Sequence, residues 1–319
     1  MEEALKKGRK QDKENLSGML EAMAQFYYNN EDYDASDRIY RELLKMDDSA
    51  LLPKVGIARN LNAREQYDQA LALLDECLRY DSDYAEIYRF RMQAYEGKKE
   101  FKKMIDEMIT LYEKSENVNH LSEKRFLKDR KYAFAVIREK IAGEEDNVLW
   151  RYLLASLYKA CHMYAEAVPL YGGLMEEYGV DEDLLEERAE CYEEMGFTDL
   201  ALADIDKAIE VGRERNRPYY YAVRGSINRH AGRYQECIDD IEKYIERYPT
   251  DAYGYYVRGW CKELSGNRAG AYEDYDEGIA VDEDYPYIFL MRGTLYLEDG
   301  DVEKANQDFE RVVAKDTTL

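Results

Sequence analysis

The sequence is poor in proline and cysteine and has no long apolar run. It holds 5 prolines and 5 cysteines in 319 residues. With so few prolines, long helices can run without interruption. The cysteines are widely spaced, so we interpret them as reduced thiols that serve as small core residues. No N-terminal apolar segment and no apolar stretch of membrane length occurs, which predicts a cytoplasmic protein that does not bind membranes.

Signatures of catalysis and of metal binding are also missing. Only 3 histidines occur, and none stands in the spacing of a zinc site. The sequence contains no phosphate-binding loop, no dinucleotide glycine fingerprint and no nucleophile elbow. We therefore expect that the protein is not an enzyme and needs no metal or other cofactor.

Positive charge is scarce relative to negative charge. The net charge is −23, which disfavours a phosphate-binding surface and hence nucleic acid, and favours basic partners. The one locally basic stretch covers residues 121–140. We interpret it as a solvated helix face, with contact to an acidic partner or to another copy of the chain as the alternative.

What the sequence does contain is an internal repeat of 34 residues: Arg224-Gly225 recurs as Arg258-Gly259 and again as Arg292-Gly293. Small residues dominate the eighth and twentieth positions of each repeat, and the twenty-fourth is large and apolar. Small residues let two helices approach closely, and the large one fills the gap beside them. Each repeat is therefore predicted to be an antiparallel helix pair that buries its apolar face by stacking on its neighbours. The repeats begin at residues 17, 51, 85, 148, 182, 218, 252 and 286.

This pattern resembles the tetratricopeptide repeat family. The resemblance rests on the 34-residue spacing and on segments such as YYNNEDYDASDRIYRELLKMD at 27–47 and YLEDGDVEKANQDFERVVAKD at 296–316. It implies an all-α fold, a right-handed superhelical solenoid of antiparallel helix pairs with about eight regular repeats and one degenerate repeat. The family's bulky residue at the fourth position is replaced by Lys54 and Arg151 in two repeats. The style of the sequence suggests a bacterial source.

The repeats also predict a domain organisation. Residues 1–16 form a charged N-terminal segment or cap, and 17–118 hold three repeats. Residues 119–147 are too few for a regular repeat and predict a degenerate helix hairpin, after which 148–319 hold five repeats. The last repeat has no polar helix to cover it. This predicts a truncated chain, self-association through that repeat, or a partner held against it.

Arginine at the seventh position of a repeat is accompanied by a carboxylate sixteen residues later. Where the seventh position is apolar, as at Ile57 and Leu154, the later residue is apolar too, as at Leu73 and Leu170. The two positions change together in all eight regular repeats, so we predict contact between the paired helices and ion pairs that fix their register. The predicted pairs are Arg91–Glu107, Arg188–Asp204, Arg224–Asp240, Arg258–Asp274 and Arg292–Asp308.

The resemblance implies that the first helix of each repeat lines a concave groove. At the positions expected to face this groove, the repeat at 182 is acidic and the three that follow are rich in aromatic residues. Tyrosine and tryptophan are favoured anchors in protein interfaces. The candidate groove residues are Glu186, Glu190, Tyr219, Arg229, Tyr253, Tyr256, Trp260, Tyr287 and Leu290.

These patterns predict a non-enzymatic scaffold or adaptor that binds a protein or peptide with basic and apolar residues. For the tyrosines, the alternative is that they only pack against neighbouring helices. For the protein, one alternative is the dedicated regulatory subunit of an enzyme or signalling complex. A second is an RNA-binding helical repeat, which the acidic groove disfavours.

Overall fold

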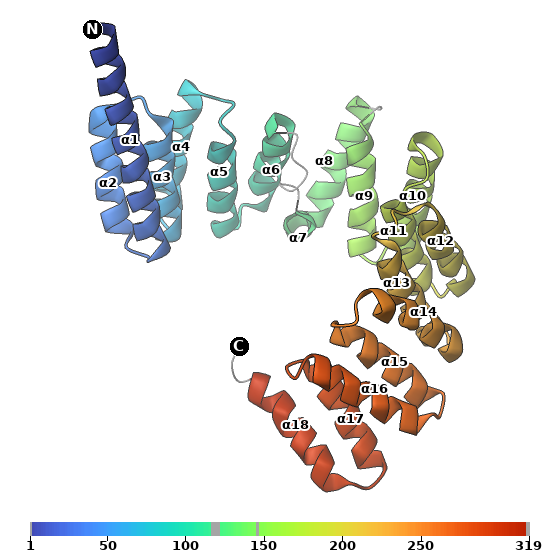
Figure 1. The fold of residues 1–319 in the computed structure, drawn as a ribbon. Coiled ribbons are helices and arrows are strands. Elements are labelled where there is room, and N and C mark those ends of the chain that lie inside the picture. Colours follow the sequence, from blue (N-terminus) through green and yellow to red (C-terminus); the bar gives the residue numbers. More distant parts are fainter. Residues whose placement is uncertain (1, 116–121, 145–146, 317–319) are drawn as a thin grey trace. The chain divides into compact units, whose positions relative to one another are not determined.

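Helices make up the ordered structure throughout the part of the chain that the computed structural model describes, residues 2–115, 122–144 and 147–316 (Figure 1). Over these ranges no strand is present, and no helix is both long and apolar enough to cross a membrane. The chain divides into two compact lobes, an N-terminal lobe at Met1–Gly143 and a C-terminal lobe at Glu144–Leu319.

The N-terminal lobe holds three helix pairs followed by shorter elements. The pairs are α1 (Glu2–Asn29) with α2 (Tyr33–Met46), α3 (Leu51–Ala63) with α4 (Tyr67–Tyr80), and α5 (Ala85–Gly97) with α6 (Phe101–Ser115). The short elements are α7 (Glu123–Phe126), the 3₁₀ turn η2 (Leu127–Asp129) and α8 (Arg130–Gly143). A full second helix, α8, thus occurs where the degenerate hairpin was predicted, while 119–121 and 145–146 lie outside the described residues.

The C-terminal lobe is a run of five helix pairs. They are α9 (Val148–Ala160) with α10 (Tyr164–Tyr178), α11 (Glu182–Glu194) with α12 (Thr198–Val211), α13 (Arg217–His230) with α14 (Tyr234–Arg247), α15 (Ala252–Leu264) with α16 (Arg268–Val281), and α17 (Pro286–Glu298) with α18 (Val302–Asp316). The partners of each pair pack on one another, and the second helix of one repeat packs on the first helix of the next. The predicted all-α fold of stacked helix pairs is confirmed within each lobe.

The turn inside every regular repeat passes through a residue with positive φ. Four repeats use glycine at this position, with φ between 74° and 87°, and four use another residue with φ near 60°. Glycine adopts this conformation without steric cost, whereas other residues lose roughly 1–2 kcal/mol. The turn geometry is therefore retained even in the four repeats that lack glycine, the residue that adopts it with the least strain. The residues are Gly196, Gly232, Gly266 and Gly300, and Glu31, Glu65, Lys99 and His162.

The core lies between the paired helices, at the small and large positions of the repeat. Ala58 and Leu74 are both fully buried in one repeat. In another, buried Gly259 faces the ring of Tyr275, and a Cβ atom added to that glycine would lie only 2.6 Å from the ring carbon Cε1. Phe309 is the exception among the large residues and is half-buried. Close approach of the helices at alanine or glycine thus determines the spacing of these two pairs.

The cysteines correct one prediction. Cys237 of α14 and Cys261 of α15 are buried and form a disulfide, with Cα atoms 6.7 Å apart. Cys237 is the twentieth residue of its repeat and Cys261 the tenth residue of the next, and no other pair of successive repeats has cysteine at both positions. Cys77, Cys161 and Cys191 are free thiols. The prediction of five reduced thiols is therefore wrong for this pair.

Candidate functional site

Arginines at the seventh position lie against carboxylates of the second helix of their own repeat. In the repeat at 182, Arg188 donates two hydrogen bonds to Asp204, at 2.8 and 2.7 Å. Arg258 donates from two nitrogens to one oxygen of Asp274, at 3.0 and 2.6 Å. The aspartates of these pairs are nearly or fully buried, with 1–7% of their surface exposed. The same contact is made by Arg91–Glu107, Arg224–Asp240 and Arg292–Asp308.

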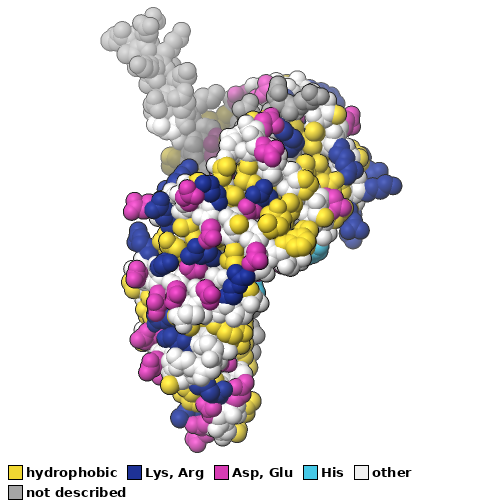
Figure 2. All heavy atoms as spheres, turned by 90° about the vertical axis from the view of Figure 1, so that its right-hand side faces the viewer, with side chains coloured by type: hydrophobic (Ala, Val, Ile, Leu, Met, Phe, Trp, Pro, Cys, Tyr) yellow, Lys and Arg dark blue, Asp and Glu magenta, His cyan; other side chains and the backbone are white. Residues whose placement is uncertain are grey.

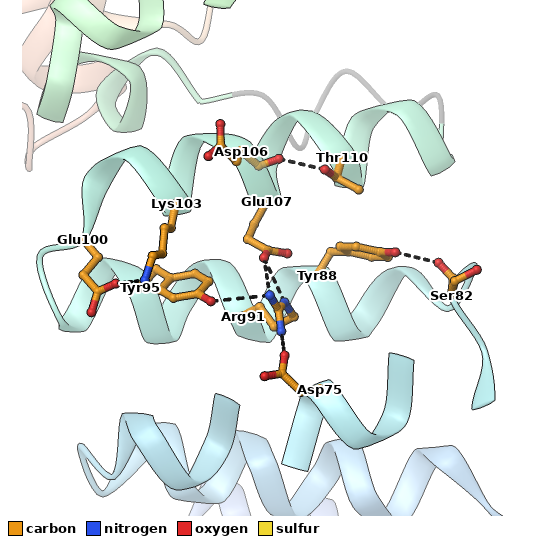
Figure 3. Close-up of polar contacts among 10 residues, drawn as sticks. All are labelled: Asp75, Ser82, Tyr88, Arg91, Tyr95, Glu100, Lys103, Asp106, Glu107 and Thr110. Atoms are coloured by element: carbon orange, nitrogen blue, oxygen red, sulfur yellow. Dashed lines mark hydrogen bonds and ion pairs between the residues drawn. The ribbon is translucent and has the colours of Figure 1, made fainter. Parts of the chain in front are cut away.

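The structure adds a partner that sequence reasoning missed. Figure 3 shows Arg91 of α5 between Glu107 of α6 and Asp75 of α4, which belongs to the preceding repeat. The arginine therefore joins three helices rather than two. An acidic twenty-fifth position in the preceding repeat is the sequence signal that points to this bridge. Equivalent bridges are Arg224–Asp206 and Arg292–Asp276.

A concavity of about 390 Å³ in the C-terminal lobe brings together the acidic and aromatic candidate residues. We call it the acidic hollow. Carboxylates of α11 form one wall, and residues of α13, α14 and α15 form the others. The lining residues are Glu186, Glu190, Glu193, Tyr219, Ala222, Val223, Ser226, Ile227, Tyr244 and Tyr253. Four predicted groove residues, Glu186, Glu190, Tyr219 and Tyr253, thus line one cavity.

Glu186 is the most perturbed carboxylate of the acidic hollow. It is half-buried, and it accepts a hydrogen bond from the phenol of Tyr219. Burial raises the pKa of Glu186, and the charges of Glu187, Asp183 and Glu190 raise it further, while the phenol lowers it. The surroundings of Glu186 therefore disfavour its charged form.

Aromatic side chains extend from the acidic hollow along the first helices of the next two repeats. The ring of Tyr253 lies 5.8 Å from that of Tyr244 and 6.4 Å from that of Tyr256, between ring centres. Tyr256 in turn lies 5.8 Å from Trp260 and 6.0 Å from Tyr287. We call Tyr253, Tyr256, Trp260, Tyr285 and Tyr287 the aromatic cluster. It shares Tyr253 with the acidic hollow, so the two surfaces are continuous.

Two further candidates lie beside these surfaces. The guanidinium of Arg229 lies over the ring of Trp260, 4.0 Å from its centre, which is the geometry of a cation–π contact. Leu290 is 43% exposed and Tyr287 is 56% exposed on α17, outside the acidic hollow. The alternative that the tyrosines pack on neighbouring helices therefore holds in part, because Tyr253 and Tyr256 are half-buried among other rings.

The protein surface carries charges of both signs. Figure 2 shows one face, on which basic and acidic side chains lie side by side with hydrophobic ones between them. Despite the net charge of −23, that face is therefore not uniformly acidic. No basic residue lines the acidic hollow, in contrast. Within the described ranges no cluster of three His, Cys, Asp or Glu side chains has the arrangement of a metal site.

Replacing Glu186 by glutamine is expected to raise the free energy of unfolding at neutral pH by about 0.5–1 kcal/mol. The change relieves repulsion from Asp183 and Glu190, one helical turn away, and each such pair costs roughly 0.2–0.5 kcal/mol. Because the folded-state pKa of Glu186 is raised, the gain is full above that pKa. It disappears below the unfolded value of about 4.3, where the carboxyl is protonated in both states.

Chemical denaturation at neutral and at acidic pH measures this gain. Glu246→Gln is the matched control, since Glu246 is exposed on α14 and outside the acidic hollow. We expect the control to change stability by less than about 0.5 kcal/mol. A Glu186→Gln variant that is less stable than the wild type at neutral pH would show that the carboxylate is a structural element.

Comparison with known proteins gives one family. Residues 287–316 match the family model of the tetratricopeptide repeat. Tetratricopeptide repeat protein 13 of Homo sapiens is 23% identical over 60% of this chain and 23% of its own length. A TPR repeat-containing protein of Methanocaldococcus jannaschii is 21% identical over 91% of this chain and 54% of its own length. The chain thus spans about half or less of these curated relatives.

Comparison with solved structures finds, among others, a segment of MamA from Desulfovibrio magneticus RS-1. Its TM-score is 0.47 at 15% identity, covering 55% of this chain and 97% of the solved one. The C-terminal part of a TPR repeat-containing protein of Cytophaga hutchinsonii has a TM-score of 0.45 at 15% identity, covering 83% and 96%.

Proposed function

We propose that this chain, of which residues 287–316 match the tetratricopeptide repeat, is a scaffold that binds a protein or peptide partner and has no catalysis of its own. Helix pairs of this kind give a rigid surface on which a partner can lie, and the family is one of protein-interaction modules. The partner is held by the acidic hollow and the aromatic cluster of the C-terminal lobe.

One observation carries this proposal: the acidic hollow is continuous with a cluster of aromatic side chains that are half-buried or exposed. Carboxylates attract basic residues, and large half-exposed rings bind apolar side chains at low entropic cost. Tyr253 belongs to both surfaces. The fitting partner is therefore an extended segment with a basic residue and an apolar residue close together.

The five arginine–carboxylate pairs have a separate role in this proposal. Their carboxylates are mostly buried between helices, and they lie outside the acidic hollow. They hold each helix pair in register, and the bridges to the preceding repeat hold neighbouring pairs in register too. The recognition surface is thereby kept in one shape.

Selection from a random peptide library displayed on phage, with the full chain as bait, tests the proposal. We expect the recovered peptides to be enriched in basic and apolar residues. A synthetic copy of a recovered peptide should quench or shift the fluorescence of Trp260 on titration, and a Trp260→Phe variant should lose that signal. A Tyr256→Ala variant should bind the peptide at least tenfold more weakly.

The negative control is a polyuridine strand, which should not compete with the peptide because the acidic hollow repels phosphate. The proposal fails if the recovered peptides bind the wild type and a Glu186→Gln, Tyr256→Ala double variant equally well. That result would show that the peptides bind to another surface of the protein.

A further inference from the structure

The acidic hollow contains a negative charge that the protein itself leaves without a cation. Glu190 forms an ion pair with Lys159 at 2.7 Å, and Glu193 is in hydrogen-bond contact with the imidazole of His230 at 2.6 Å. For Glu186, the contact within the described part of the chain is the neutral phenol of Tyr219. A half-buried carboxylate among like charges is unfavourable unless something positive reaches it.

The walls around Glu186 suit an organic cation. Tyr219, Tyr244 and Tyr253 line the acidic hollow together with Ala222 and Ile227. Aromatic faces attract cations electrostatically, and the apolar residues accommodate a hydrocarbon stem. The volume of about 390 Å³ is at the small end of ligand pockets, which span roughly 300–1,000 Å³. It has room for one side chain rather than for a folded segment.

The N-terminal lobe contains a second concavity, which has a cation among its lining residues. This second concavity, of about 450 Å³, includes Glu21, Tyr40 and Arg59 in its lining. Arg59 stacks over the ring of Tyr28 at 3.8 Å and donates a hydrogen bond to Gln25 at 2.6 Å. The acidic hollow has the carboxylates and the tyrosines but no arginine or lysine among its lining residues.

We propose that the acidic hollow is a receptor for one cationic side chain, a lysine or an arginine of the partner, whose charged group is bound by Glu186. This inference rests on the proposed function and assigns a separate role to each of the two surfaces. The acidic hollow binds the basic residue, and the aromatic cluster binds the apolar one. The cation donates a charge-assisted hydrogen bond to Glu186, so it must carry an N–H group.

Four small amides separate this chemistry from a purely aromatic cage. The probes are the Nα-acetyl methylamides of lysine, arginine, norleucine and Nε-trimethyllysine, titrated into the full chain and followed by saturation-transfer NMR. We expect lysine and arginine to bind, and norleucine to bind at least tenfold more weakly because it lacks the charge. Trimethyllysine has the charge but no N–H donor, so it should bind about tenfold more weakly than lysine.

Three variants locate the binding group. Glu186→Gln should weaken the lysine probe about tenfold, whereas Glu246→Gln, which removes the same charge from an exposed site on α14, should leave it unchanged. Tyr219→Phe keeps the ring and removes the hydroxyl group that donates a hydrogen bond to Glu186. It should bind the lysine probe at least as tightly as the wild type. If Glu186 only anchored Tyr219, this variant would bind more weakly.

The inference is overturned if norleucine binds as well as lysine, if trimethyllysine binds more tightly than lysine, or if Glu186→Gln leaves the lysine probe unaffected. These results are independent of the peptide selection. If the lysine probe binds but the library yields no binding peptide, the scaffold proposal alone is contradicted. Selected peptides whose binding needs no basic residue would sink the cation receptor alone.

Discussion

Replacing Asp274 with alanine is expected to lower the free energy of unfolding by about 3–5 kcal/mol, the usual cost of breaking a buried ion pair from one side. Asp274 is 1% exposed. It accepts a hydrogen bond from Arg258 at 2.6 Å and lies 2.9 Å from Nζ of Lys262. Its removal leaves two cations near a cavity between α15 and α16, without the carboxylate that neutralised them.

The double variant Arg258→Leu, Asp274→Leu should recover most of that loss. The repeat at 148 already holds this combination, as Leu154 and Leu170. Denaturant unfolding of Arg258→Leu, Asp274→Leu and the double variant measures the coupling, which should exceed about 2 kcal/mol. Glu42→Ala is the control for a surface pair, since Glu42 and Lys45 are largely exposed, and it should cost less than about 1 kcal/mol. Additive effects of the two leucine substitutions would show that the pair makes no joint contribution.

Gly259→Ala is the second large effect, and we expect it to destabilise the protein by about 1–2 kcal/mol. Alanine normally stabilises a helix interior relative to glycine by roughly 1 kcal/mol. Here the new methyl group would lie 2.6 and 2.9 Å from ring carbons of Tyr275, which is fully buried and cannot swing away. Overpacking of this kind costs about 1–3 kcal/mol and outweighs the gain in helix propensity.

Gly173→Ala is the matched control for this substitution. Gly173 lies inside α10, and a Cβ atom there would meet nothing within 4 Å. The same substitution should therefore stabilise the protein by about 1 kcal/mol. Thermal or denaturant unfolding of the two variants should give opposite signs. Equal signs would show that helix spacing is not determined at the small positions of the repeat.

The contacts inside one repeat could be predicted because they recur at one spacing. Arg258 and Asp274 are sixteen residues apart, as are Leu154 and Leu170, and the geometry of an antiparallel helix pair brings that spacing into contact. Gly259 and Tyr275 follow the same logic at the small and large positions. Because the repeats hold different residues at the same two positions, comparing them within one chain shows that the two positions change together.

Contacts between repeats were harder to predict, because they depend on how neighbouring helix pairs stack. The bridge from Arg91 to Asp75 and the disulfide between Cys237 and Cys261 both cross such a boundary. The stacking of Arg229 on Trp260 crosses one too. The sequence predicted that Arg229 and Trp260 both face the groove. That they contact each other could be seen only from how α13 and α15 pack.

The candidate site was predictable as a set of residues but not as a cavity. The helical spacing of Glu186 and Glu190 placed both on one face of α11. Two features depend on the packing of α11 against α13: the closure of that face by Tyr219 and the burial that raises the pKa of Glu186. The periodicity of a helix predicts which face a side chain lies on, but it does not predict which residues of a neighbouring helix pack against that face.

A structure of the full chain with a phage-selected peptide bound tests the central claim most directly. Our account predicts the ammonium or guanidinium of one basic residue within hydrogen-bond distance of Glu186, and an apolar residue of the same peptide against Tyr256 or Trp260. A peptide bound in the concavity beside Arg59, or on the second helices of the repeats, would contradict it.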